Sequence, residues 1–292
     1  MPMKGFGIKA AIAENPCAPI LPSFFVIGPP RTGTSWLHMV LGECAWLSYP
    51  TKETRFFDKH FEFGLDWYRS HYRKVCDGRP VGEVAPTYFA SQDARERIAR
   101  LLPAAKIVCT FRDPVARVLS LYRLKRAYGM IPWAFDDALA RDPELMESSR
   151  YATHLTEWLK TFGASQIMVT MYEDLQADPQ RYLDKVLDFL GIPRMELRAS
   201  HKRRVFTAET MTEPRHYLLT RGALLLAEWS KKQRIGSFVH TAKKWGAEKL
   251  FLGGGPPFPE VPSSEKMKLR QMFRGEIEQL EAMLNRDLSA WK

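Results

Sequence analysis

Residues 24–37, FFVIGPPRTGTSWL, decide the fold that we expect for this chain. An apolar, β-rich run leads into a turn rich in glycine and proline, and a segment with helical character follows. Strand, turn and helix together form a phosphate cradle, because the first N–H groups of a helix are unpaired and carry the positive end of its dipole. Gly28 and Gly33 keep the spacing of a nucleotide P-loop, GxxxxGK[ST]. However, Thr34 stands where that motif has lysine, and Arg31 is the only cation in the loop.

The alternation of strands and helices continues along the chain and predicts the fold class. Strands are expected at 23–28, 79–83, 105–114 and 165–175, and helices at 34–47, 91–103, 114–129, 178–193 and 263–290. Such βαβ units predict a single α/β domain, with a mostly parallel central sheet flanked by helices and sites at the carboxyl ends of the strands.

The expected domain spans residues 23–292 and follows an extended, proline-containing leader at 1–22. Within it, residues 198–262 form a basic segment that we expect on the acceptor side or as a lid. From 198 to 249 there are twelve Lys or Arg against four Asp or Glu. An amphipathic packing helix with an exposed basic face is the simpler interpretation of this segment, and contact with an anionic membrane surface is the alternative.

Composition limits the class of protein. The chain has 292 residues, 45% of them hydrophobic and 26% charged, which is ordinary for a globular protein. Its formal charge of +10 favours an anionic partner: a nucleotide, a nucleic acid, a membrane surface or an acidic substrate. The four cysteines show neither CxxC spacing nor a Cys/His cluster, so we expect a reducing compartment and no metal site. With no apolar signal core and no membrane-length apolar run, the expected location is the cytoplasm.

A second candidate phosphate site follows the strand at 105–114. Arg112 lies at the end of this strand, and Ser120 lies nearly two turns into the next helix. A guanidinium and a hydroxyl so placed can hold one phosphate, because arginine offers a planar fork of donors. The alternative is that Arg112 pairs with Asp113 or with a carboxylate at the sheet edge. Two phosphate sites on neighbouring strand ends favour the first interpretation.

Four segments in the right order resemble the sulfotransferases that use 3′-phosphoadenylyl sulfate (PAPS). GPPRTGTSWL (28–37) is similar to their 5′-phosphosulfate loop, and RDPVARVLSLYR (112–123) to their 3′-phosphate segment. MYEDLQADPQRYLDKVLDFLGIP (171–193) is similar to a third shared stretch. KETRFFD (52–58) resembles the KExxFFD segment of the carbohydrate, or heparan-type, branch, as does the closing helix.

The resemblance implies roles for residues of the donor site. PAPS is the expected donor and 3′,5′-ADP (PAP) the product, with no metal required. Arg31 would face the bridging oxygen and stabilise charge on the departing 5′-phosphate, which the amides and hydroxyls of the loop would hold. The residues expected to bind the donor are Arg31, Thr32, Gly33, Thr34, Ser35, Trp36 and Tyr172 near adenine, Arg112 and Ser120, and Lys202, Arg203 and Arg204 in a basic loop over the 3′-phosphate. For Trp36 an ordinary core role is equally compatible with the sequence, and Tyr172 is a weaker adenine candidate because YEDL could simply end a strand.

The resemblance also implies a base. Glu53, the glutamate of KExxFFD, would take the proton of an acceptor hydroxyl or amine, and Glu83 is the second candidate, as a base or as an orienting group. The acceptor is expected to be a small molecule or a glycan. Two features depart from the heparan-type pattern: Val84 stands where EKxPxYF has lysine, and no cysteine follows Cys109.

Two other classes fit the sequence less well. A P-loop kinase would need the Walker lysine that is missing here. A basic nucleic-acid or membrane-surface binder would leave both phosphate loops unexplained, and without an RNP1-, KH- or homeodomain-like pattern we expect no nucleic-acid partner.

Overall fold

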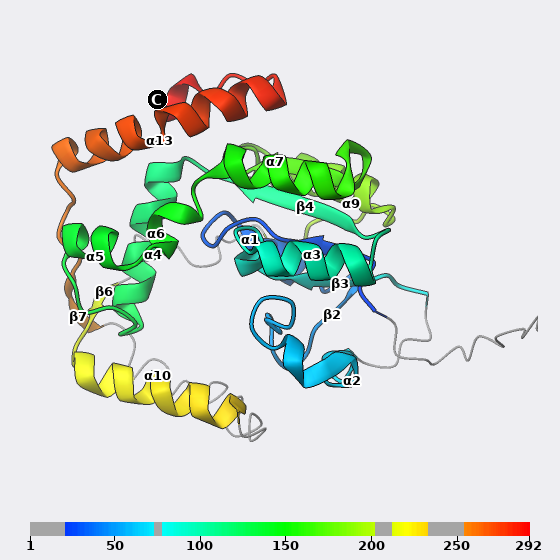
Figure 1. Cartoon of the computed structure of the whole chain (residues 1–292), viewed down its shortest axis with the longest axis horizontal. Helices are drawn as coiled ribbons and strands as arrows, with labels where there is room; N and C mark the ends of the chain where they lie inside the picture. Colours follow the sequence, from blue (N-terminus) through cyan, green and yellow to red (C-terminus); the bar gives the residue numbers. More distant parts are fainter. Residues whose placement is uncertain (1–20, 73–77, 202–211, 233–253) are drawn as a thin grey trace, which may run out of the picture.

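The computed structural model describes residues 21–72, 78–201, 212–232 and 254–292. At its centre is a five-stranded sheet in the order β2-β3-β1-β4-β5, in which every neighbouring pair is parallel (Figure 1). The strands are β1 (Phe24–Val26), β2 (Trp46–Leu47), β3 (Val81–Val84), β4 (Lys106–Phe111) and β5 (Ile167–Met171). β2 and β3 lie on one side of β1, and β4 and β5 lie on the other. The strand order therefore reverses at β1, which is where parallel sheets place their ligands. The predicted fold class is confirmed.

Helices connect and cover these strands. The helices up to residue 190 are α1 (Thr34–Leu41), α2 (Gly64–Arg69), α3 (Gln92–Leu101), α4 (Pro114–Ala127), α5 (Phe135–Arg141), α6 (Glu144–Glu147), α7 (Tyr151–Phe162), α8 (Tyr172–Ala177) and α9 (Pro179–Leu190). Side chains cap three of them: Ser91 accepts a hydrogen bond from the Ala94 amide, and Asp113 and Asp178 cap α4 and α9.

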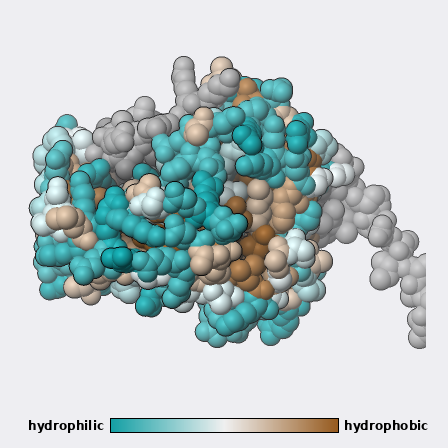
Figure 2. Space-filling view, turned by 90° about the horizontal axis from the view of Figure 1, so that it is seen from above, coloured by the Kyte–Doolittle hydropathy of each residue, from teal (hydrophilic) through white to brown (hydrophobic). Residues whose placement is uncertain are grey.

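The last long helix, α13 (Ser263–Leu284), packs against α7 and α4. It buries Leu269, Phe273, Ile277 and Leu280 and leaves its other side to solvent. The face of the molecule that carries α13 is mostly hydrophilic (Figure 2). The bidentate ion pair of Arg286 with Asp174, at 2.7 Å for both bonds, ties the end of this helix to α8.

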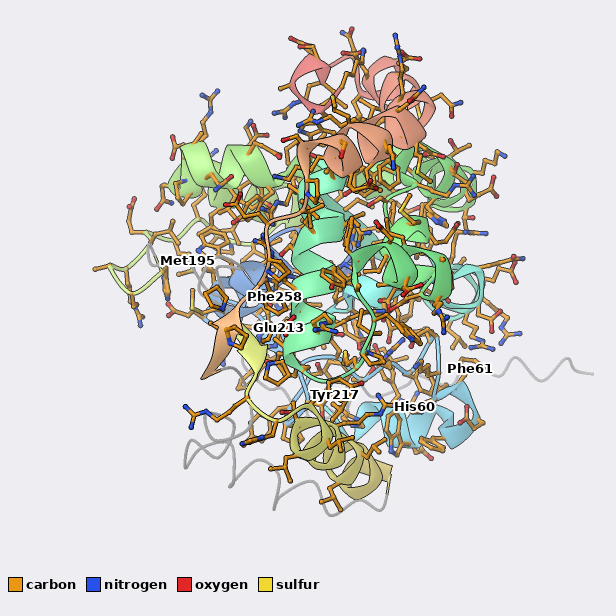
Figure 3. The ribbon with its side chains drawn as sticks, turned by 90° about the vertical axis from the view of Figure 1, so that its left-hand side faces the viewer. His60, Phe61, Met195, Glu213, Tyr217 and Phe258 are labelled. Carbon is orange, nitrogen blue, oxygen red and sulfur yellow. The ribbon has the colours of Figure 1, made fainter. Side chains whose placement is uncertain are left out.

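A small second sheet and one further helix complete the described residues. β6 (Thr212–Pro214) pairs antiparallel with β7 (Gly254–Pro257), and α10 (Tyr217–Lys232) follows β6. Figure 3 labels Glu213 on β6 and Tyr217 at the start of α10. Glu213 pairs with Arg126 at 2.6 Å, which ties this sheet to α4. The run GGGPPFPEVP (253–262) is rich in glycine and proline and indicates a loop, whereas Gly254–Pro257 form β7.

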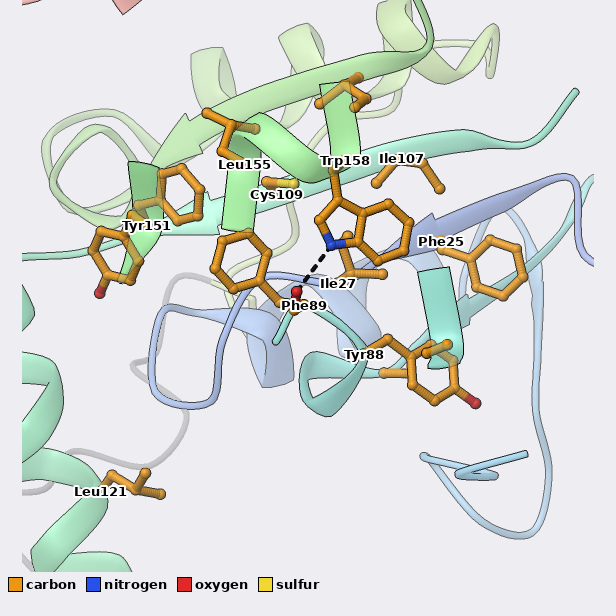
Figure 4. Packing of buried hydrophobic residues seen from close by; sticks show 14 of the residues in the cluster. Phe25, Ile27, Tyr88, Phe89, Ile107, Cys109, Leu121, Tyr151, Leu155 and Trp158 are labelled. Atoms are coloured by element: carbon orange, nitrogen blue, oxygen red, sulfur yellow. Dashed lines mark hydrogen bonds between the residues drawn. The ribbon is translucent and has the colours of Figure 1, made fainter. Parts of the chain in front are cut away.

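Alternation along the strands builds two cores, one on each face of the central sheet. Phe25 and Ile27 join the core beneath α3, α7 and α13, whereas Phe24 and Val26 join the core beneath α1 and α9. Trp158 of α7 lies in the first core, and its indole N–H donates to the Phe89 carbonyl at 2.9 Å (Figure 4).

Three predicted boundaries are wrong. The helix expected to reach residue 47 ends at Leu41, and Trp46–Leu47 form β2, because short apolar runs do not distinguish a strand from a continued helix. The strand expected to reach residue 175 ends at Met171, and α8 begins at Tyr172. The closing helix ends at Leu284, where Asn285 adopts a left-handed conformation with φ 47°.

Candidate active site

The loop between β1 and α1 leaves the start of the helix open to an anion. Arg31 and Gly33 both have positive φ, 79° and 96°, and Gly33 is the N-cap of α1. No side chain caps this helix. The first N–H groups of α1 thus lie at the positive end of the helix dipole without the side-chain acceptor that α3, α4 and α9 have.

Close packing against β4 fixes this loop. A Cβ on Gly28 would lie 1.9 Å from Thr110 Oγ1 and 2.5 Å from the Thr110 amide nitrogen, so only glycine fits here. Thr32 is fully buried, and its hydroxyl donates to the Pro29 carbonyl at 2.7 Å and bonds Thr110 Oγ1 at 2.6 Å. The Thr32 hydroxyl is therefore used inside the loop, which leaves its backbone amide for the predicted phosphate role.

The two predicted phosphate sites are in contact. Arg31 Nε donates to Ser120 Oγ at 2.9 Å, across 89 residues of sequence. Arg112 Nη1 donates to the Arg31 carbonyl at 3.4 Å, and its guanidinium lies 4.7 Å from the centre of the Tyr172 ring. Burial lowers the pKa of Arg31, and the positive charge of Arg112 lowers this pKa further. Two arginines therefore lie together at this end of the sheet, which favours an anionic ligand there.

Lys52 is a third cation at this site, and it is not among the residues expected from the sequence to bind the donor. Its Nζ donates to Ser35 Oγ at 3.1 Å and lies 3.4 Å from Glu53 Oε1. Burial lowers the pKa of Lys52, whereas the Glu53 carboxylate raises it. Lys52 therefore connects the candidate base to the donor loop. Its position in KETRFFD, directly before the candidate base Glu53, could have predicted that Lys52 lies at this site.

The two candidate bases differ in access. The Glu53 side chain is 29% exposed, so an acceptor can reach it. Glu83 is fully buried at the end of β3 and accepts hydrogen bonds from Thr54, Tyr68 and Tyr88. Burial raises the pKa of Glu83, and these hydrogen bonds act in the opposite direction. An acceptor molecule has no access to Glu83 as the residue lies here, so the structure favours an orienting role for it.

Trp36 lies in the core between α1 and α9. It is 7% exposed, meets Tyr182 edge to face at 6.0 Å, and donates its indole N–H to the His201 carbonyl at 2.8 Å. This environment is that of a core aromatic, and contact with adenine stays a prediction. The bond to His201 anchors the chain immediately before the predicted basic loop of Lys202, Arg203 and Arg204, which lies outside the described residues.

Other sequence-based expectations concern Val84, the cysteines and metals. Val84 is buried against β1, so its side chain does not occupy the acceptor position that a lysine is expected to reach. Cys44 and Cys109 are free thiols. Across the described parts of the chain, no group of three or more His, Cys, Asp or Glu side chains could hold a metal ion. No helix in those same parts is long and apolar enough to cross a membrane.

Comparison with known proteins identifies the family. The model of the sulfotransferase domain matches residues 21–244, which is most of the chain. This chain belongs to the sulfotransferase family. The expectation of a sulfotransferase, drawn from the four motifs, is thus confirmed.

Relatives and solved structures agree with this assignment. The sulfotransferase is 32% identical to bifunctional heparan sulfate N-deacetylase/N-sulfotransferase 1 of Mus musculus over 194 residues, which are 59% of this chain and 22% of the relative. It is 29% identical to heparan sulfate glucosamine 3-O-sulfotransferase 6 of Homo sapiens over 271 residues, or 90% and 72% of the two chains. These relatives support the carbohydrate branch, although this chain spans about a fifth of the first one's length. The fold is that of a sulfotransferase from Alicyclobacillus acidocaldarius, with a TM-score of 0.66, 21% identity, and coverage of 93% of this chain and 99% of that one.

Proposed function

We propose that this sulfotransferase transfers the sulfuryl group of PAPS to a hydroxyl or amine of a glycan, with Glu53 as the general base. One observation carries the proposal. Arg31, Lys52 and Arg112 gather around the uncapped start of α1, and the partly exposed carboxylate of Glu53 lies at the edge of this cation cluster.

The proposed transfer is an in-line displacement. The acceptor oxygen or nitrogen forms a bond to sulfur while the bond between sulfur and the bridging 5′-phosphate oxygen breaks, and the electron pair stays on that oxygen. Glu53 takes the acceptor proton. Arg31 is the residue that would neutralise the departing phosphate, and the amides of Gly33, Thr34 and Ser35 would hold it. As in phosphoryl transfer, catalysis here rests on positioning and on electrostatic stabilisation.

A glycan acceptor is supported by the relatives, whose names specify heparan sulfate. The net charge of +10 is compatible with an anionic glycan. The buried Val84 removes one lysine that the heparan-type motif would supply, so a less acidic glycan fits this chain better. The cytoplasmic location expected from the sequence stays a prediction.

Thermal unfolding with PAP, compared with ATP and Mg²⁺, tests the donor site. At a hundredfold its Kd, a ligand stabilises by about 2.7 kcal/mol, which raises Tm by about 5 °C for a chain of this size. We expect this shift with PAP alone. It should be lost in Arg112→Ala and kept in Arg181→Ala, which removes an exposed arginine of α9. A shift with ATP and Mg²⁺ alone would instead indicate a kinase, and no shift with either would favour the basic binding surface.

Transfer itself is tested with ³⁵S-labelled PAPS. Heparan sulfate, N-desulfated heparan sulfate, a neutral glycan and a simple phenol are offered as acceptors. Label in a glycan supports the proposed class, whereas label in the phenol alone would place the enzyme with small-molecule sulfotransferases.

A further inference from the structure

We infer that Glu83 is a positioning residue, which sets the place of the base Glu53 by holding the neighbouring Thr54. The inference rests on the proposed function only in naming Glu53 as the base. The observation behind it is a buried carboxylate at the end of β3 whose hydrogen bonds reach the segment that carries Lys52 and Glu53.

The contacts of Glu83 are directed at that segment. Oε1 accepts from the Thr54 amide at 3.1 Å and from the Thr54 hydroxyl at 2.6 Å. The same oxygen lies 3.2 Å from the Tyr88 hydroxyl, and Oε2 accepts from the Tyr68 hydroxyl at 2.7 Å. Two carboxylate oxygens thus accept from four donors, which is how a buried charge becomes tolerable.

The network extends through these hydroxyls to the next amides of the segment. The Phe56 amide donates to Thr54 Oγ1 at 3.1 Å, and the Phe57 amide donates to the Tyr88 hydroxyl at 3.3 Å. Three backbone N–H groups just after Glu53 are therefore held by Glu83, either directly or through one hydroxyl. In contrast, the Glu53 side chain is partly exposed, and among the described residues its ion pair is with its neighbour Lys52.

This arrangement has a consequence for catalysis. A base must lie within hydrogen-bond reach of the acceptor proton, and a displacement of about 1 Å can reduce the rate by about a hundredfold. Among its described contacts, the Glu53 side chain has no buried hydrogen-bond partner that would fix its position. The position of its carboxylate therefore depends on how firmly its backbone is held. Glu83 anchors the adjacent backbone from a strand end of the central sheet, which also carries the donor loop.

The test uses Thr54→Val and Glu83→Gln in the full chain. Thr54→Val keeps the side-chain volume but removes the hydroxyl that Glu83 binds, and Thr54→Ser restores a hydroxyl. Thr87→Val is the matched control, because the buried Thr87 hydroxyl has no hydrogen-bond partner among the described residues. Three quantities are measured: kcat for transfer from PAPS to the best glycan acceptor, the Kd for PAP, and hydrogen exchange of the peptide covering residues 51–58.

We expect kcat to fall by about 10- to 100-fold in Thr54→Val and Glu83→Gln, with a Kd for PAP within twofold of the wild type. Exchange should accelerate in residues 51–58 alone. Thr54→Ser should recover most of the rate, and Thr87→Val should resemble the wild type. If Glu83→Gln does not fold, the comparison of Thr54→Val with Thr54→Ser still tests the positioning role.

A purely structural role predicts something else. Faster exchange with an unchanged kcat would overturn the inference, as would equal losses of kcat and PAP affinity or a Thr54→Ser variant as slow as Thr54→Val. If the wild type transfers sulfate to none of the acceptors, it is the proposed acceptor class that has failed. The rate of PAP release from PAPS in the absence of acceptor then replaces kcat in the same comparison.

Discussion

Glu53 forms an ion pair with Lys52 at the edge of the donor loop, and its role as the base can be tested by changing this one residue. Glu53→Gln keeps the size of the side chain but cannot take a proton, so we expect transfer to fall by at least about a hundredfold. The Tm shift with PAP should remain. Glu62→Gln, which removes an exposed carboxylate of the 3-10 helix at Phe61–Phe63, is the control and should transfer at the normal rate. Wild-type turnover in Glu53→Gln would exclude this residue as the base.

His38 makes a second prediction at the scale of a single residue. Its Nε2 is buried without a hydrogen-bond partner in the described structure, and burial together with the charge of Lys52 lowers its pKa to about 4. The unfolded histidine titrates near 6.5, so between these values the unfolded chain binds the proton more readily. The free energy of unfolding therefore falls as the pH decreases, by about 2 kcal/mol from this group at pH 5.

Urea denaturation at pH 7.5 and pH 5.0 measures this difference. It should be smaller in His38→Gln than in the wild type, because the variant lacks the group that titrates. His216→Gln, which removes an exposed histidine, should keep the wild-type difference. An unchanged difference in His38→Gln would show that other groups cause the pH dependence.

At the scale of elements, the close approach of the donor loop to β4 is the critical contact. Gly28→Ala would place a methyl group 1.9 Å from Thr110 Oγ1, so β1 and β4 would have to separate. We expect a loss of about 2–4 kcal/mol in the free energy of unfolding. Gly275→Ala is the matched control, because beyond the nearby backbone of its own helix no described atom lies within 4 Å of the position that its Cβ would take on α13. Alanine should stabilise that helix by about 0.5–1 kcal/mol, and equal effects of the two substitutions would contradict the packing described here.

At the scale of the whole molecule, α13 closes one face of the same core that supports the site. Phe273 is 3% exposed in that core, so Phe273→Ala should lower the free energy of unfolding by about 3–5 kcal/mol. Met272 is 65% exposed, so Met272→Ala should change it by less than about 0.5 kcal/mol.

Thermal unfolding followed by circular dichroism and by tryptophan fluorescence should show one transition, because α13 shares its core with α3 and α7. Two separate transitions would show that α13 folds as a separate unit.

The sequence by itself determined the elements whose signals are local. β1, the glycine-rich loop and the start of α1 follow from an apolar run and a glycine, and α3, α4 and α9 begin where Ser91, Asp113 and Asp178 can cap them. Each of these features depends on residues that are close together in the sequence, so it can be predicted from the sequence alone.

Only the tertiary structure decided the strand order, the two-residue strand β2 and the partners within the site. Arg31 reaches Ser120 across 89 residues, and Glu83 reaches Thr54 across 29. The sequence alone allows Glu83 as a base or as an orienting group, and only its burial among hydroxyl donors distinguishes the two. Such contacts form only when separate elements pack against one another. The spacing of the residues along the chain does not indicate which of them will come into contact.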